Sequence, residues 1–249
     1  MMKTTLKKTL PRLALAALSL LSYSPGFGQT FQGTVTYAQD FVLSKAFLDM
    51  GVTKEMILSK LQTGGDWGDT IKVSYNRQGD YHSLTNSKKG LIKIYRSEAN
   101  KIYTFGEGKA SEKVSVQDAI DLDLSGVPDK PEIKKLDTAV TINGIKCTGL
   151  TVQWKLSKID YFYNSSELKI DAAVFSRHST DGWAEYLKAS RALPLRIIKN
   201  VFGMSMIQTM VSAKSEEVSP DLFKIPVLVA DESLNVIKMP GVEIMRIKK

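Results

Sequence analysis

The chain has 249 residues and a formal net charge of +8, and 43% of its residues are hydrophobic. That length and composition suffice for one domain with a hydrophobic core. Four basic residues and no acidic ones fall within the first 28 residues, so the remainder has 30 basic against 26 acidic residues, a net charge near +4. A small excess of scattered positive charge argues against a nucleic-acid-binding surface.

The first 28 residues have the pattern of a secretory signal peptide. Basic residues come first, and the apolar run over 13–21 is too short to span a bilayer. Gly26-Phe27-Gly28 then supplies the small-x-small pattern of a cleavage site, so we expect cleavage near Gly28. The alternative is an uncleaved membrane anchor, which the short run and the turn residues at 24–26 disfavour. The four basic residues are Lys3, Lys7, Lys8 and Arg12.

The same segment indicates where the mature protein resides. No cysteine lies in or just after the apolar run, which argues against a cysteine-acylated lipoprotein. No later segment is long and apolar enough to serve as an integral membrane anchor. We therefore expect a soluble, exported protein that resides in the periplasm.

Cys147 is the single cysteine, so no intramolecular disulfide can form. It lies in a strand-like run over 145–152. Because free cysteine is among the most frequently buried residues, we expect Cys147 to act as a small buried hydrophobe. An intermolecular disulfide and a reactive thiol are the alternatives.

Beyond Gln29 the hydrophobic period is two, which predicts a mainly β, antiparallel domain with one face of each strand toward a core. Polar residues between the strands indicate hairpin turns, most clearly Asn143-Gly144. No internal repeat interrupts this single domain over 29–249. The expected strands cover 31–37, 71–75, 81–84, 91–96, 101–105, 139–142, 145–155, 159–163, 193–202 and 204–214.

Four segments depart from this period. Residues 41–62 have apolar residues at helical spacing and predict two short helices, with a kink or cap at 51–53. Residues 117–134 are acidic and contain proline, which indicates a short helix or a surface loop. Ser219 followed by Pro220 predicts one helical turn over 219–223. The C-terminal extension over 227–249 fits either a final strand pair or an arm packed on the domain.

Short motifs at 31–37, 142–147, 193–195 and 222–226 give the chain a family resemblance. In this order and spacing, the chain resembles envelope proteins of unknown function from Gram-negative bacteria, whose domain is similar to the outer-membrane lipoprotein carrier superfold. The resemblance covers about residues 31–226. It implies a strongly curved antiparallel sheet, a half-open barrel, with short helices that cover the concave face.

The resemblance also implies a lipidic or otherwise apolar ligand, held between the sheet and a helical lid formed by residues 41–62. Methionines on one face of the strand 204–214 would adapt to a flexible ligand. The alternative is that these side chains only pack on the sheet and fill its core. The residues expected at the ligand are Phe41, Leu43, Phe47, Leu48, Met50, Met56, Ile57, Met204, Met206 and Met210.

Residues with catalytic chemistry are sparse, so we expect no enzyme, no metal and no cofactor. Only two histidines are present, which argues against a histidine-rich zinc site. His178 has serines and Asp181 nearby, but we expect this segment to be an extended strand, in which neighbours face opposite sides. The glycines at 64–68 and 106–108 lack the lysine and helix of a phosphate loop, and the acidic residues at 118–129 match no calcium loop.

Two functions follow from the sequence, and an unrecognised hydrolase is a third alternative that the sparse catalytic residues disfavour. The first is an exported, noncatalytic protein that carries or senses an apolar ligand in the periplasm. The alternative is a protein-interaction module in envelope assembly or maintenance, which would use sheet edges or the segment 41–62 to bind an envelope protein.

Overall fold

The computed structural model describes residues 30–65, 67–107, 112–123, 125–201, 203–234 and 239–248. The predicted signal peptide and its cleavage site lie outside the described residues. Within them, every strand joins one antiparallel sheet, in the order β12-β13-β6-β5-β4-β3-β2-β1-β11-β10-β9-β8-β7. β12 and β7 are the two edges, so the sheet is not closed, and the prediction of a mainly β antiparallel fold is confirmed.

The strands and helices have the following bounds. The strands are β1 (Gly33–Leu43), β2 (Gly68–Tyr75), β3 (Tyr81–Ser87), β4 (Leu91–Arg96), β5 (Lys101–Gly106), β6 (Lys113–Asp118), β7 (Glu132–Ile142), β8 (Ile145–Gln153), β9 (Lys158–Tyr163), β10 (Arg196–Val201), β11 (Met204–Ser215), β12 (Leu228–Ala230) and β13 (Val242–Ile247). The α-helices are α1 (Lys45–Asp49), α2 (Lys54–Gly64) and α3 (Trp183–Ser190), and the 3-10 helices are η2 (Ala172–Phe175), η3 (Thr180–Gly182), η4 (Pro220–Phe223) and η5 (Glu232–Leu234).

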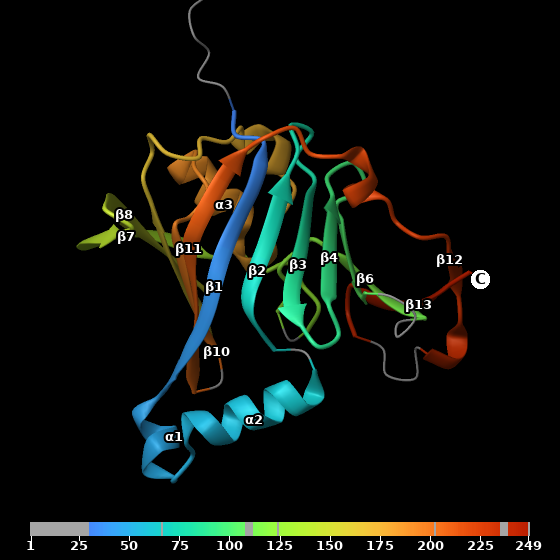
Figure 1. Cartoon of the computed structure of the whole chain (residues 1–249), viewed down its shortest axis with the longest axis horizontal. Coiled ribbons are helices and arrows are strands. Elements are labelled where there is room, and N and C mark those ends of the chain that lie inside the picture. The colour runs from blue at the N-terminus through green and yellow to red at the C-terminus, as the bar shows by residue number, and fades with distance from the viewer. Residues whose placement is uncertain are drawn as a thin grey trace, which may run out of the picture.

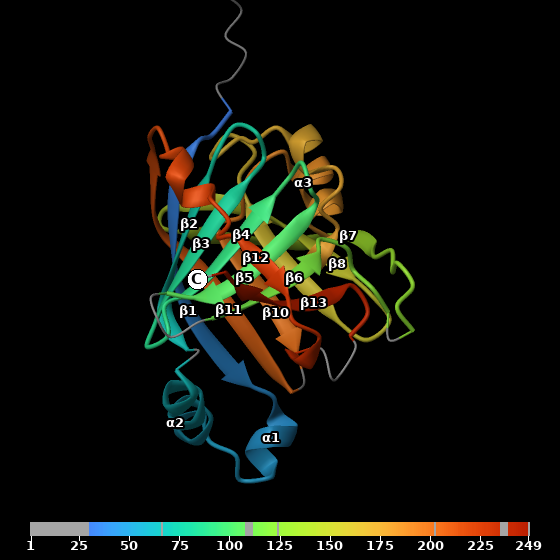
Figure 2. The ribbon, with the colours of Figure 1, turned by 90° about the vertical axis from the view of Figure 1, so that its right-hand side faces the viewer.

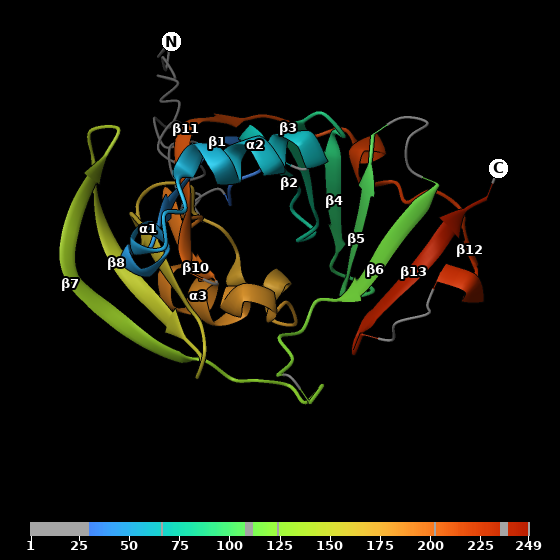
Figure 3. The same cartoon turned by 90° about the horizontal axis from the view of Figure 1, so that it is seen from below.

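The sheet is bent, and helices occupy two different places around it. Seen from below, the strands follow an arc with α3 inside it (Figure 3). Helices α1 and α2 lie beyond the lower end of β1 and β2, away from α3 (Figures 1 and 2). The molecule therefore has one helix on the concave side of the sheet and a helical pair that projects from its end.

β1 lies near the middle of the sheet and shows why the strands form. Val35, Tyr37 and Phe41 are buried, while Thr34 and Thr36 between them are only half-buried. This alternation places one face of β1 toward the core. Val35 lies opposite Val73 of β2, so adjacent strands contribute apolar residues to the same face.

The segment over 172–190, which contains η2, η3 and α3, packs against the concave face through aromatic rings. The ring of Tyr186 in α3 stacks on Tyr161 of β9 at a centroid distance of 4.2 Å. The imidazole of His178 lies 4.3 Å from the ring of Tyr95 on β4. Gly182 starts α3 with φ of 64°, and an added Cβ there would lie 2.3 Å from Val152 of β8. The segment is therefore held between strands on both sides of the arc.

The segment 172–190 also corrects the sequence analysis. We expected an extended strand around His178, and the structure instead has helical turns over 172–175 and 180–190. Trp183, Tyr186, Leu187 and Ser190 are all buried, and their spacing places them on one side of a helix. That spacing was a helical signal, but the run of eight residues was too short to stand out among the strands.

The segment 41–62 contains two helices, as its apolar spacing indicates, but they begin later than expected. β1 continues to Leu43, because Phe41 and Leu43 keep the period of two and are buried. Ser44 then caps α1, and Thr53 caps α2 by accepting a hydrogen bond from the backbone N–H of Met56. Gly51, with φ of 75°, separates the two helices.

The structure also tests the predictions for turns, for Cys147 and for the C-terminal extension. Asn143 and Gly144 both have positive φ and join β7 to β8, as the hairpin signal predicted. Cys147 is buried and free, as predicted. The described residues between β6 and β7 form a loop, and η4 forms the predicted turn. The C-terminal extension adds a strand pair, β12 and β13, to the sheet next to β6.

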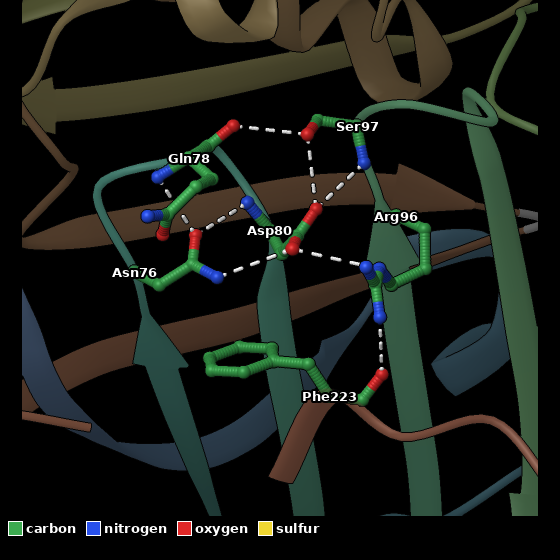
Figure 4. A network of polar contacts seen from close by, with 6 residues as sticks. All are labelled: Asn76, Gln78, Asp80, Arg96, Ser97 and Phe223. Atoms are coloured by element: carbon green, nitrogen blue, oxygen red, sulfur yellow. Dashed lines mark hydrogen bonds and ion pairs between the residues drawn. The ribbon is translucent and has the colours of Figure 1, made fainter. Parts of the chain in front are cut away.

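A polar network around Asp80 connects three turns at one end of the sheet (Figure 4). Asp80 is 5% exposed, and its Oδ1 accepts hydrogen bonds from the backbone N–H and the hydroxyl of Ser97, at 2.8 and 2.9 Å. Its Oδ2 accepts from Asn76 at 3.1 Å and pairs with Arg96 at 3.5 Å. Arg96 in turn donates to the carbonyl of Phe223 at 2.7 Å. One buried carboxylate thus links the β2–β3 turn, the β4–β5 turn and η4.

We predict that Asp80→Ala lowers the free energy of unfolding by about 2–4 kcal/mol, because it leaves buried donors without an acceptor and Arg96 without its partner. Urea denaturation measures this change. Asp49→Ala is the matched control, since Asp49 makes only an exposed ion pair with Lys45 and should leave stability unchanged. Equal effects of the two substitutions would contradict the assigned role of the network.

Candidate functional site

A hollow of about 390 Å³ lies between the concave face of the sheet and the segment 172–190. Its walls come from the inward-facing residues of eight strands, β1 to β5 and β9 to β11. The strand alternation explains this lining, because residues two apart on each strand face the same side. A volume of this size falls within the range of about 300–1,000 Å³ found for small-molecule sites.

Much of the wall is apolar. Ile71 and Val73 of β2, Ile197 of β10 and Met206 of β11 line the hollow and lie on strands that are adjacent or close in the sheet. Tyr161, Trp183 and other aromatic side chains close the end formed by the segment 172–190. This surface provides the apolar area on which an alkyl chain or a ring system would pack.

Charged side chains stand among these apolar ones. Lys199 of β10 forms an ion pair with Asp181 of η3, with Nζ and Oδ1 2.5 Å apart. Lys93 of β4 also lines the hollow, and its side chain remains accessible to solvent. Partial desolvation by the surrounding protein lowers the pKa of its ammonium. The backbone of Asp181 is fixed by Asp121, whose carboxylate accepts hydrogen bonds from the N–H groups of Asp181 and Gly182 at 2.9 and 3.0 Å.

Burial shifts the pKa values of two groups at this end of the hollow. Desolvation raises the pKa of Asp121 to about 6, against the lowering effect of its two backbone hydrogen bonds. Desolvation also lowers the pKa of His178, which is 3% exposed, to about 4. His178 is therefore a neutral imidazole at pH 7.

The neutral His178 ring makes one hydrogen bond, between Nε2 and the hydroxyl of Tyr81 at 3.1 Å. Its Nδ1 is buried and has no hydrogen-bond partner within the described part of the chain. Burial raises the pKa of Tyr81 well above its usual value, so the hydroxyl stays protonated. Tyr81 and His178 together form an uncharged polar group in the wall of the hollow.

The ten residues expected at a ligand are not brought together. Only Met206 lines the hollow. Phe41 and Leu43 are buried in β1, where Phe41 makes an edge-to-face contact with Trp67 at 5.3 Å, and Met210 belongs to the core. Met204 is half-buried at the start of β11.

The remaining five expected residues belong to α1, α2 and their junction, beyond the end of the sheet. The side chains of Phe47 and Ile57 are half-buried, and the ring of Phe47 lies against Gly203. Leu48, Met50 and Met56 are 55%, 66% and 50% exposed. None of these five lines the hollow, so the segment 41–62 does not cover it in this structure.

The polar residues of the hollow were not found from the sequence, although a signal existed. Lys93 is two residues from Leu91 and Tyr95, and Lys199 is two residues from Ile197 and Val201, so each lysine shares a strand face with apolar residues. A cation within an apolar strand face was the available signal. Asp181 gave no such signal, because the fold of its segment was mispredicted.

The described residues offer little for metal or membrane-spanning roles. They contain no group of three or more His, Cys, Asp or Glu side chains placed to hold a metal ion. None of the helices within the described ranges has both the length and the apolar composition needed to cross a membrane.

Comparisons with known proteins add no assignment. No family model matches the chain, and no curated protein matches it. Among solved structures, PNGF-II in the C2 space group is similar over 77% of this chain and 29% of its own, at 14% identity and a TM-score of 0.39. PNGF-II in the P21 space group is similar over 78% of this chain and 30% of its own, at 13% identity and a TM-score of 0.39. The chain thus spans less than a third of PNGF-II, and a similarity at this TM-score carries no argument about fold or activity.

We predict that the buried, neutral state of His178 makes stability depend on pH. As pH falls below about 6.5 the unfolded chain binds a proton at this residue before the folded chain does, so stability present above pH 6.5 is lost toward pH 4. The loss amounts to about 3 kcal/mol relative to His178→Gln.

Urea denaturation of both proteins from pH 4 to pH 7 measures this difference. Asp121 acts in the opposite direction, because its raised pKa reduces stability as pH rises from 3.8 toward 6, but it is common to both proteins and cancels in the comparison. A difference between the two proteins that stays constant with pH would contradict a neutral, buried His178.

Proposed function

We propose that this chain is an exported, noncatalytic binding protein that carries or senses a lipidic or otherwise apolar ligand in the periplasm. In this proposal the bent sheet is the half-open barrel of the lipoprotein carrier superfold, which the sequence resembles, and the hollow is the ligand site.

The observation that carries the proposal is an inward-facing surface that the side chains of the protein do not fill. Ordinary cores are close-packed, so a hollow of about 390 Å³ lined by residues such as Ile71, Val73 and Ile197 leaves apolar area in contact with water. Each methylene of a ligand that fills it gains about 0.8 kcal/mol. Affinity would then grow with the length of the buried chain.

The placement of α1 and α2 changes how such a carrier would work. Since these helices lie beyond the end of β1 and β2, the segment 172–190 is the helical cover of the concave face. It is held by buried aromatic contacts, so we propose that ligand enters through the open side of the hollow and not by movement of this cover.

A second function, the protein-interaction module, is favoured by one specific observation. Leu48, Met50 and Met56 are exposed on neighbouring parts of α1, α2 and their junction. Large apolar side chains exposed on a projecting element are the kind of residue that a partner protein would cover. In a carrier, the same surface would serve to bind the protein that delivers or receives the ligand.

We predict that native mass spectrometry of the purified protein detects a copurified amphiphile, and that Ser83→Phe removes it. Ser83 lies on β3 and lines the hollow, so the new ring would occupy the ligand volume while leaving the apolar contacts of the fold in place.

Asn86→Phe is the matched control, because Asn86 lies on the same strand but is exposed on the opposite face. It should leave the bound amphiphile and the melting temperature unchanged. Retention of the ligand by folded Ser83→Phe would place the binding site elsewhere, and protein that never carries an amphiphile would favour the interaction module.

A further inference from the structure

Lys93 is a cation on the inward face of the sheet that lacks a carboxylate partner. Within the described residues its ammonium makes no hydrogen bond and no ion pair. The residues opposite Lys93 on the two adjacent strands are neutral, namely Ser83 of β3 and Thr104 of β5. The side chain is accessible to solvent inside the hollow, so its ammonium is available to pair with an anionic group of a ligand.

Two charged residues, Asp181 and Lys199, act electrostatically on Lys93. Asp181 and Lys199 both lie close enough to influence it, but they are paired with each other. His178 at the same end of the hollow is neutral at pH 7. The three charged side chains that line the hollow therefore sum to one positive charge, and Lys93 is the group left without compensation.

The position of Lys93 relative to the apolar wall defines the shape of a complementary ligand. Lys93 is on β4, and the apolar residues Ile71 and Val73 are two strands away on β2, with Met206 and Ile197 farther along the same sheet. A ligand that reaches both would have a charged end and an apolar body. The volume of about 390 Å³ suits a single chain of modest length.

We infer that the ligand is a single-chain amphiphile with an anionic headgroup, a carboxylate or a phosphate, which pairs with Lys93 while its chain packs against β2, β10 and β11. This inference rests on the proposed function and narrows its ligand class. Lys199 and Asp181 neutralise each other, so the headgroup compensates the one remaining positive charge, that of Lys93.

The test uses isothermal titration calorimetry on delipidated protein with four probes of equal chain length. These are dodecanoate, dodecyl phosphate and dodecyltrimethylammonium below their micelle concentrations, and dodecanol below its solubility limit. We expect the two anions to bind at least tenfold more tightly than dodecanol, and the cation to bind more weakly still. The ratio of dodecanoate to dodecyl phosphate affinity distinguishes a carboxylate from a phosphate headgroup.

Lys93→Met should abolish the preference for anions while leaving dodecanol affinity within about twofold, since methionine keeps most of the apolar stem of lysine. Lys72→Met is the matched control, because Lys72 is exposed on β2 between the inward-facing Ile71 and Val73, and it should leave all four affinities unchanged. Retained dodecanol affinity in Lys93→Met also shows that the variant is folded at the site.

The outcomes separate this inference from the proposed function. If all four probes bind equally, or if Lys93→Met keeps the preference for anions, the headgroup assignment is wrong while the apolar binding function stands. If none of the probes binds to the wild-type protein, both are wrong. Salt should weaken the binding of the anions and leave that of dodecanol nearly unchanged, and the absence of this difference would also overturn the assignment.

Discussion

Aromatic packing between the bent sheet and the segment 172–190 is the contact on which the rest of the structure depends. His178 and Phe175 pack on Tyr95, at 4.3 and 6.2 Å, and Tyr186 stacks on Tyr161 at 4.2 Å. Because these rings come from both sides of the arc, they fix the segment inside it and keep the strands apart. The concave face that the rings do not reach remains open and forms the hollow.

The hollow shares its wall with the core. Tyr161 and Trp183 line the hollow and also belong to the core cluster, so the same rings stabilise the fold and form the site, while the Asp80 network holds the turns at one end of the sheet. Lys93 and the Lys199–Asp181 pair line the hollow but remain accessible to solvent, so they contribute little to stability and are available to a ligand. The exposed helical pair provides a second surface whose apolar residues face solvent.

The sequence predicted the sheet better than the site, for identifiable reasons. Strand alternation and turn residues located the hairpins around Asn143-Gly144 and 97–100, because both signals are local. The site depends on contacts between distant segments, such as Tyr81 with His178 and Lys199 with Asp181, which no local pattern reports. The apolar residues of α1 and α2 drew attention by composition alone, and composition does not place a helix inside or outside the arc.

The most direct test of the account is isotope-filtered NMR of the protein with labelled isoleucine and valine methyl groups and unlabelled dodecanoate. The account predicts intermolecular contacts between the chain methylenes and the methyl groups of Ile71, Val73 and Ile197, all of which line the hollow. Contacts confined to residues of α1 and α2, with none to these three, would show that the hollow is not the binding site.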